Sequence, residues 1–191
     1  MKAKWMIAAC FAIASCAAWA QTKQIVSVDV RDYCDPKTFN AAVGPGACQR
    51  GTENGAITFN GFVAELGADK SVGAWRFAPS GVNAKPGALE VVKLKNNGGE
   101  THTFTRVKNF GGGFVPALNA ASGQPTVAPE CAKTVNGQLQ PQPPSKSNIF
   151  LAPGDSAFGL TLGEENQNAK FQCCIHPWMH AIINATPQTG R

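Results

Sequence analysis

Short runs of alternating apolar and polar residues, separated by glycines and prolines, dominate this 191-residue chain. Residues 24–30 read QIVSVDV and residues 101–107 read THTFTRV, so every second side chain falls on the same face. Such runs are typical of half-buried strands. Further candidate strands, bounded by turn residues, lie at 56–66, 74–79, 87–96, 149–153, 156–162, 169–174 and 181–185. The pattern predicts an all-β sandwich.

Two stretches exceed what a minimal sandwich needs. Residues 31–51 carry a cysteine near each end, which predicts a loop closed by a disulfide. Residues 109–148 are rich in Gly, Pro, Gln and Asn, and a loop of that length is either functional or disordered. We therefore expect one domain over residues 21–191, with an N-terminal extension (21–58) and a long insertion (109–148).

The first twenty residues have the features of an export signal. Two lysines precede a short apolar segment, and AWA at 18–20 has the small-x-small pattern of a cleavage site. Cleavage after Ala20 would place the protein in the periplasm or outside the cell. The apolar segment is too short for a membrane span. Two alternatives remain open: a buried N-terminal helix, and a lipid anchor on Cys16, because IASC at 13–16 resembles a lipoprotein box.

The charges argue against one class of partner. Removal of residues 1–20 leaves 15 basic and 12 acidic residues, a net charge of +3. They are scattered, whereas nucleic-acid binding needs a dense basic stripe. No nucleic-acid partner is expected, and the small positive charge permits only weak steering toward an acidic partner.

The cysteine count is odd once the signal is removed. Cys10 and Cys16 leave with it, and the five that remain are Cys34, Cys48, Cys131, Cys173 and Cys174. Exported proteins form disulfides in an oxidising compartment. At least one of the five thiols therefore has no intramolecular partner and needs another role.

That role is suggested by FQCCIHPWMH at 171–180. Cys173, His176 and Met179 are spaced three residues apart, so a strand that ends in a tight loop can aim all three at one point. Thiolate, imidazole and thioether together favour copper. A second histidine would complete the trigonal His₂Cys set with a weak axial methionine that is typical of electron-transfer copper. His102, on the same face as Phe104 in its strand, can supply it.

Only one of the adjacent cysteines can face the core. The two-residue period of a strand places Phe171 and Cys173 on one face and Gln172 and Cys174 on the other. Phe171 is the large apolar residue, so Cys173 is the expected ligand and Cys174 points away. A redox-active disulfide between the two cysteines is the metal-free alternative, and it leaves His176 and Met179 without a role.

CCIHPWM resembles the C-x-x-H-x-x-M ligand loop of the cupredoxins, in the short form of amicyanin-like and plastocyanin-like proteins. The order of motifs over 73–107 and 148–185 resembles the same family. The resemblance implies an eight-stranded, cupredoxin-like Greek-key β-sandwich. It also implies one type 1 (blue) copper ion with four metal ligands: His102, Cys173, His176 and Met179. Ala181 and Cys174 depart from the family's usual residues.

Such a site implies electron transport between a redox donor and acceptor, with no catalytic residues. An oxidase or nitrite reductase needs a second copper centre, and the chain has only three histidines. We therefore expect no enzyme. The alternative is a periplasmic copper carrier or reservoir with the same ligands. His176 is the expected electron port, Trp178 an apolar docking residue and His180 a surface residue, with Asn96 or Asn97 supporting the ligand loop.

Copper on Cys173 would leave an even number of cysteines, which allow three pairings. Cys34 and Cys48 bracket a short loop, so their closure costs little entropy. Cys131 then pairs with Cys174, which would tie the long insertion to the ligand strand.

Overall fold

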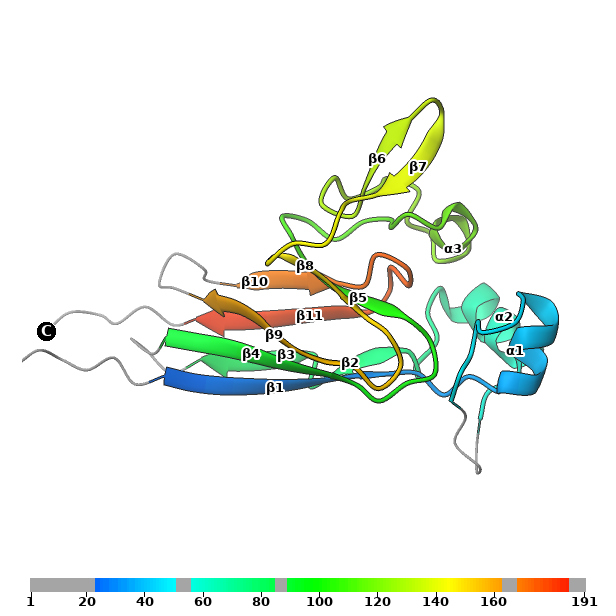
Figure 1. Cartoon of the computed structure of the whole chain (residues 1–191). Helices are drawn as coiled ribbons and strands as arrows, with labels where there is room; N and C mark the ends of the chain where they lie inside the picture. Colours follow the sequence, from blue (N-terminus) through cyan, green and yellow to red (C-terminus); the bar gives the residue numbers. More distant parts are fainter. Residues whose placement is uncertain (1–22, 51–55, 85–88, 163–167, 186–191) are drawn as a thin grey trace, which may run out of the picture.

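The computed structural model describes residues 23–50, 56–84, 89–162 and 168–185, so the expected signal at 1–20 lies outside the described residues. Two sheets pack face to face (Figure 1). The first has the order β2-β1-β4-β9, with β1 (Lys23–Arg31), β2 (Arg76–Ala78), β4 (Leu89–Asn96) and β9 (Ser156–Leu162). The second has the order β3-β11-β10-β5-β8, with β3 (Gly81–Ala84), β5 (His102–Val107), β8 (Asn148–Leu151), β10 (Ala169–Gln172) and β11 (His180–Ala185). The predicted all-β sandwich is confirmed.

The core follows from the alternation in the sequence. In β1, Val26, Val28 and Val30 are buried, whereas Ile25, on the opposite face of the same strand, is exposed. Phe104 of β5 stacks on Phe171 of β10, with ring centroids 4.4 Å apart. Phe77, from the opposite sheet, meets Phe104 edge-on at 5.1 Å. These rings join the two sheets, and burial of each large aromatic side chain contributes about 1.5–3 kcal/mol.

The connections cross repeatedly between the sheets. The chain passes from one sheet to the other between β2 and β3, β3 and β4, β4 and β5, β8 and β9, and β9 and β10. The described ranges place nine strands in the two sheets, where the family resemblance implied eight. The run around residues 76–84 divides into β2 and β3, which belong to different sheets.

Residues 56–66 are helical, so the predicted strand there is wrong. α2 (Phe59–Asp69) begins at Thr58, whose side chain accepts a hydrogen bond from the N–H of Gly61. Phe62 and Leu66 are four residues apart and both are buried, which is the helical period rather than the strand period. Over the described ranges, none of the helices has the length and apolar content to cross a bilayer.

The loop closed by the Cys34–Cys48 disulfide also contains a helix. α1 (Pro36–Ala42) starts at Asp35, whose carboxylate accepts hydrogen bonds from two backbone N–H groups, with proline at the first helical position. Together, α1 and α2 cover the end of the sandwich at which β1 stops and β5 begins (Figure 1). We call residues 32–50 and 56–75 the cap. Its aromatic residues Phe39, Phe62 and Trp75 belong to the same buried cluster as the sandwich core.

The insertion is ordered rather than a bare loop. It contains α3 (Pro116–Ala121) and a hairpin of β6 (Ala132–Val135) and β7 (Gln138–Pro141) that projects from the sandwich (Figure 1). Its first part covers the outer face of β5 and β10. There it forms a small second core of Val107, Ala128, Cys131 and Cys174, flanked by Phe110 and Phe114.

Candidate metal centre

Three predicted ligands meet at the capped end of the sandwich. His102 is the first residue of β5, Cys173 directly follows β10, and His176 lies in the turn before β11. The Sγ atom of Cys173 lies 3.7 Å from Nδ1 of His102 and 3.7 Å from Nδ1 of His176. All three side chains are buried, and their ligand atoms lie within 4.8 Å of one another.

The ligand loop is closed by its own backbone. The N–H of Cys173 donates to the carbonyl of Met179 at 3.0 Å, and the N–H of Met179 donates to the carbonyl of His176 at 2.9 Å. The Cys173 sulfur accepts from the N–H groups of Thr103 at 3.4 Å and His176 at 3.5 Å. Met179 is buried at 1% exposure in this loop. Its role as the axial ligand stays a prediction.

The donor set fits one soft or borderline metal ion. Metal bonds of about 2.3 Å to sulfur and about 2.0 Å to imidazole, at angles of about 110–120°, would separate sulfur and nitrogen by about 3.5–3.7 Å. The two sulfur-to-nitrogen separations of 3.7 Å agree with that range. A thiolate and two imidazoles without a bound carboxylate are the donor types that suit copper.

His102 is oriented by a carboxylate that the sequence analysis did not identify. Its Nε2 lies 2.8 Å from Oδ2 of the fully buried Asp32. This contact makes Nε2 a hydrogen-bond donor to the carboxylate, so Nδ1, which faces Cys173, is the nitrogen that would bind a metal ion after losing its proton. Asp32 also accepts from the N–H groups of Cys34, Gly99 and Glu100. Because its oxygens are occupied by these donors, Asp32 positions His102 rather than offering a free metal ligand.

Gly98 permits this arrangement by its lack of a side chain. A Cβ at Gly98 would lie 1.9 Å from Oδ2 of Asp32. Asn96 holds the same turn, since its amide donates to the carbonyls of Glu100 at 2.8 Å and Leu151 at 3.0 Å. Of the two asparagines proposed to support the site, Asn96, at the end of β4, makes these side-chain bonds around the turn that leads to His102.

His176 has a carboxylate partner of its own. Its Nε2 lies 3.2 Å from Oε2 of Glu100. The same oxygen accepts the indole N–H of Trp75 at 2.5 Å. The His176 ring meets Trp178 edge-on at 5.4 Å, and Trp178 in turn contacts Phe62 of the cap at 5.9 Å. His176 is only 4% exposed, so the cap covers the edge that was expected to be an electron port.

The site stabilises a thiolate beside protonated imidazole. Burial alone raises the pKa of Cys173, but hydrogen bonds from His102 and His176 outweigh it and hold the pKa well below its ordinary value. Burial lowers the pKa of His176, but Cys173 and Glu100 outweigh that effect and raise it to about 10. Burial is likewise outweighed at His102, where Asp32 and Cys173 raise the pKa. The thiolate and the two carboxylates therefore favour positive charge on the imidazole rings.

The remaining cysteines pair as predicted. Cys34 is bonded to Cys48 and Cys131 to Cys174, while Cys173 is free and buried. Cys174 lies on the outer face of the sheet. This result excludes a Cys173–Cys174 bridge and confirms the two-residue period that separated the neighbouring cysteines.

His180 differs from the expected surface residue. It is half-buried and stacks on Phe110 of the insertion, with ring centroids 3.8 Å apart. Burial lowers its pKa, against a smaller opposing effect from a hydrogen bond to the carbonyl of Pro177. His180 belongs to neither of the two groups of candidate metal donors found among the described residues, His102 with Cys173 and His176, and His102 with Asp32 and Glu100.

A cleft separates the two coverings of the ligand loop. It has a volume of about 450 Å³ and lies between Trp75 of the cap and Phe110 of the insertion. Trp178, Met179 and Ile182 are among its lining residues. The candidate axial ligand therefore lies next to a surface depression, whereas His176 lies beneath the cap.

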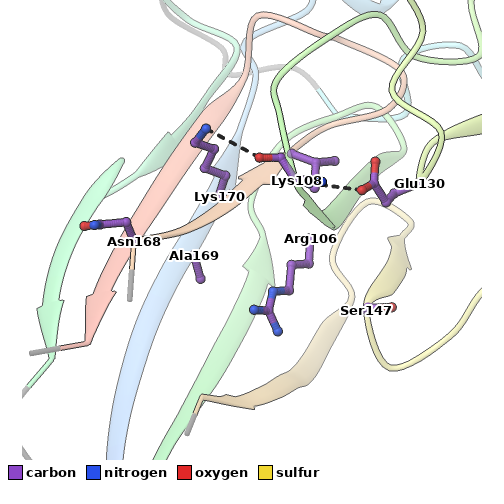
Figure 2. Close-up of a pocket in the computed structure, with 8 residues that line it drawn as sticks. Arg106, Lys108, Glu130, Ser147, Asn168, Ala169 and Lys170 are labelled. Carbon is purple, nitrogen blue, oxygen red and sulfur yellow. Dashed lines mark hydrogen bonds between the residues drawn. The ribbon is translucent and has the colours of Figure 1, made fainter. Parts of the chain in front are cut away.

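A second depression lies at the opposite end of β5 and β10 from the ligand loop. It lies where β5 ends and β10 begins, has a volume of about 500 Å³, and is lined by Arg106, Lys108, Glu130 and Lys170 among others (Figure 2). The ammonium group of Lys170 donates to the carbonyl of Lys108 at 3.4 Å, and the N–H of Lys108 donates to Glu130 at 3.0 Å. None of the four predicted ligands lines it.

Asp32, Glu100 and Trp75 are the site residues that sequence reasoning missed. A weak signal exists for Asp32, which continues the buried parity of Val26, Val28 and Val30 and so places a carboxylate on an apolar face. Glu100 and Trp75 offer no such signal, because their contact joins segments 25 residues apart.

Comparisons with known proteins give similarity in structure alone. No protein-family model and no curated protein sequence matches the chain. Among solved structures, the chain is similar to a novel purple cupredoxin from Nitrosopumilus maritimus, at a TM-score of 0.38 and 12% identity, covering 84% of this chain and 99% of that one. It is also similar to Fet3p, a multicopper oxidase that functions in iron import, at a TM-score of 0.35 and 12% identity. That match covers 97% of this chain but 38% of the oxidase. At scores this low, functional inference rests on the side chains described above.

Proposed function

We propose that this chain is an exported type 1 copper protein that carries single electrons between redox partner proteins. The observation that carries the proposal is the buried cluster of His102, Cys173 and His176, with both Nδ1 atoms 3.7 Å from the sulfur. A copper ion bound there would alternate between Cu(I) and Cu(II) and so accept and release one electron.

The chain's own residues have distinct roles in this proposal. Cys173 supplies the thiolate, which the two histidines stabilise. His102, fixed by Asp32, anchors the site at the start of β5. His176 closes the set from the loop, and Met179 is the proposed weak axial donor. With four protein donors there is no position for a substrate, and we propose no enzymatic activity.

Burial of the ligands supports an electron relay more than a copper carrier. Exchange of the ion with a chelator or a partner would require the cap or the ligand loop to open. The two disulfides agree with an oxidising compartment. Together with the signal-like residues 1–20, they support the proposal of a periplasmic or secreted protein.

An absorption spectrum tests the site. The copper(II)-loaded protein should be intensely coloured, blue or green, from charge transfer between the Cys173 thiolate and copper. Cys173→Ser should abolish the band. The matched control is Cys131→Ser with Cys174→Ser, which removes the neighbouring disulfide and should keep the band. A colourless copper(II) protein, or a band that survives in Cys173→Ser, would contradict the assignment.

A second measurement separates the relay from the carrier. Line broadening in NMR spectra of mixed Cu(I) and Cu(II) protein measures electron self-exchange, and a modest Cu(I) chelator measures release of the ion. We expect rapid exchange of electrons and slow loss of copper. Slow exchange with rapid loss would favour the carrier.

A further inference from the structure

The outer nitrogen of His176 faces a carboxylate instead of water. Nε2 lies 3.2 Å from Oε2 of Glu100, and the side chains of His176 and Glu100 are only 5% and 13% exposed. An imidazole that donates its outer N–H to a carboxylate is a stronger donor through its other nitrogen and has a fixed ring orientation. Glu100 therefore acts on the candidate ligand although it is not a ligand itself.

Trp75 holds this carboxylate in place. Its indole N–H donates to the same Oε2 atom at 2.5 Å. The Trp75 ring is 1% exposed, stacks on Phe39 at 5.7 Å and contacts Phe62 at 4.9 Å. The Glu100 side chain is thus clamped between a rigid donor from the cap and a residue of the ligand loop. Two donors share one oxygen, so each weakens the bond that the other makes.

The second candidate ligand repeats the pattern. His102 faces Asp32 through Nε2 at 2.8 Å, and the N–H of Glu100 donates to that same Asp32 carboxylate at 3.0 Å. Two carboxylates therefore stand directly behind the two imidazoles. Cu(II) carries one more positive charge than Cu(I), and charges interact strongly in a buried site where the effective dielectric constant is low. Fixed anions at these positions favour the oxidised ion.

We propose that Glu100, clamped by Trp75, is a positioning residue that orients His176 and lowers the reduction potential of the bound copper. The proposal rests on the copper function proposed above. It assigns part of the cap to the metal centre, so that the cap both covers His176 and sets the preference of the site for Cu(II).

The test compares three variants by voltammetry and by competition assays of Cu(I) and Cu(II) affinity. Glu100→Gln removes the charge and should move the potential in the positive direction. We expect at least a tenfold loss of preference for Cu(II) over Cu(I), which corresponds to about 59 mV for one electron. Glu65→Gln is the matched control, because Glu65 is a cap residue whose carboxylate accepts from the N–H of Gly73 and faces no ligand. It should leave the potential unchanged.

Trp75→Phe gives a change of opposite sign. It removes the indole donor, so the hydrogen bond from His176 to Oε2 of Glu100 becomes stronger. The reduction potential should therefore move in the negative direction. A role of Glu100 that is only structural predicts no such opposition between the two variants. If Glu100→Gln does not fold, Trp75→Phe alone decides: an unchanged or more positive potential overturns the proposal.

Failure of this inference is distinguishable from failure of the copper assignment. A wild-type protein without a charge-transfer band would refute the proposed function. A coloured protein whose Glu100→Gln variant has the same potential as Glu65→Gln would refute only the role of Glu100.

Discussion

The ligand loop is covered by two additions to the sandwich, and they are built differently. The cap is continuous with the main core through Phe39, Phe62 and Trp75. The insertion instead has a small core of its own around Cys131 and Cys174. The cap meets the loop through buried side chains of the main core. The insertion is joined to the loop region by the Cys131–Cys174 disulfide, by the backbone bond from Phe114 to Cys174, and by the side chains of Gln124 and Phe110.

The cap and the insertion also contact different residues of the site. On the cap side, Asp32 contacts His102, and Glu100 of the adjoining turn contacts His176 while it accepts a hydrogen bond from Trp75 of the cap. The insertion contacts residues beside the ligands: the N–H of Phe114 donates to the carbonyl of Cys174 at 2.9 Å. We infer that the cap belongs to the chemistry of the site and that the insertion supports the shape of the loop.

The largest expected effect is the loss of a cap aromatic residue. Phe39 is buried and contacts the rings of Phe59, Phe62 and Trp75. Phe39→Ala should lower the free energy of unfolding by about 3–5 kcal/mol. Phe114→Ala, at a half-buried ring of the insertion, should cost about 1 kcal/mol. Urea denaturation followed by circular dichroism measures both. Equal losses would show that the insertion is as integral to the core as the cap.

Removal of each disulfide should affect the free energy of unfolding and the retention of copper in opposite order. On the loop-entropy model, loss of Cys131–Cys174 costs about 4 kcal/mol and loss of Cys34–Cys48 about 3 kcal/mol. The effect on copper should have the opposite order, because the N–H of Cys34 donates to Asp32 at 3.3 Å. We expect paired Cys→Ser variants at 34 and 48 to lose copper faster than those at 131 and 174. If the variants at 131 and 174 lose copper faster instead, the insertion supports the metal centre more than the cap does.

The same contrast explains what could be predicted from sequence. Cysteines can be counted, and the strand period assigned Cys173 to the metal; the short loop between Cys34 and Cys48 then selected the pairing that leaves Cys131 with Cys174. The spacing of Cys173, His176 and Met179 is local, and the structure places the cysteine and histidine as that spacing required.

The cap could not be predicted in the same way. Residues 56–66 contain glycine and β-branched residues and read as a strand, because the buried spacing of Phe62 and Leu66 spans barely one helical turn. The bond between Asp32 and His102 joins residues 70 positions apart, and no local pattern carries such a contact. The cap buries the outer edge of His176, and because the cap was not predicted, this burial was not predicted either.

The pKa values of two histidines should be shifted in opposite directions: that of His176, beside the cap, upward and that of His180, beside the insertion, downward. In the copper-free protein, Glu100 and Cys173 raise the pKa of His176 to about 10, whereas burial against the insertion lowers the pKa of His180 below its usual 6.5. NMR titration should therefore show His180 neutral and His176 protonated at pH 7. Copper must displace the His176 proton, and also any proton on Nδ1 of His102, whose pKa is raised as well, so affinity should fall at least about tenfold, or about 1.4 kcal/mol, for each pH unit below the pKa of His176. Affinity that is constant from pH 6 to pH 8 would contradict a protonated His176.

The smallest expected effect concerns a single hydrogen bond from the insertion. The amide of Gln124 donates to the carbonyl of Pro177 at 3.1 Å, one residue beyond His176. Gln124→Ala removes this contact from a partly buried position, and such a bond contributes about 0.5–1.5 kcal/mol. Because Pro177 is not a ligand and the lost partner carries no charge, the absorption band and the reduction potential should stay as in the wild type. Glu100→Gln also alters one contact to the same loop, yet it should move the potential. If Gln124→Ala shifts the potential by as much as Glu100→Gln does, loop position rather than charge sets the potential, and the distinction drawn between cap and insertion fails.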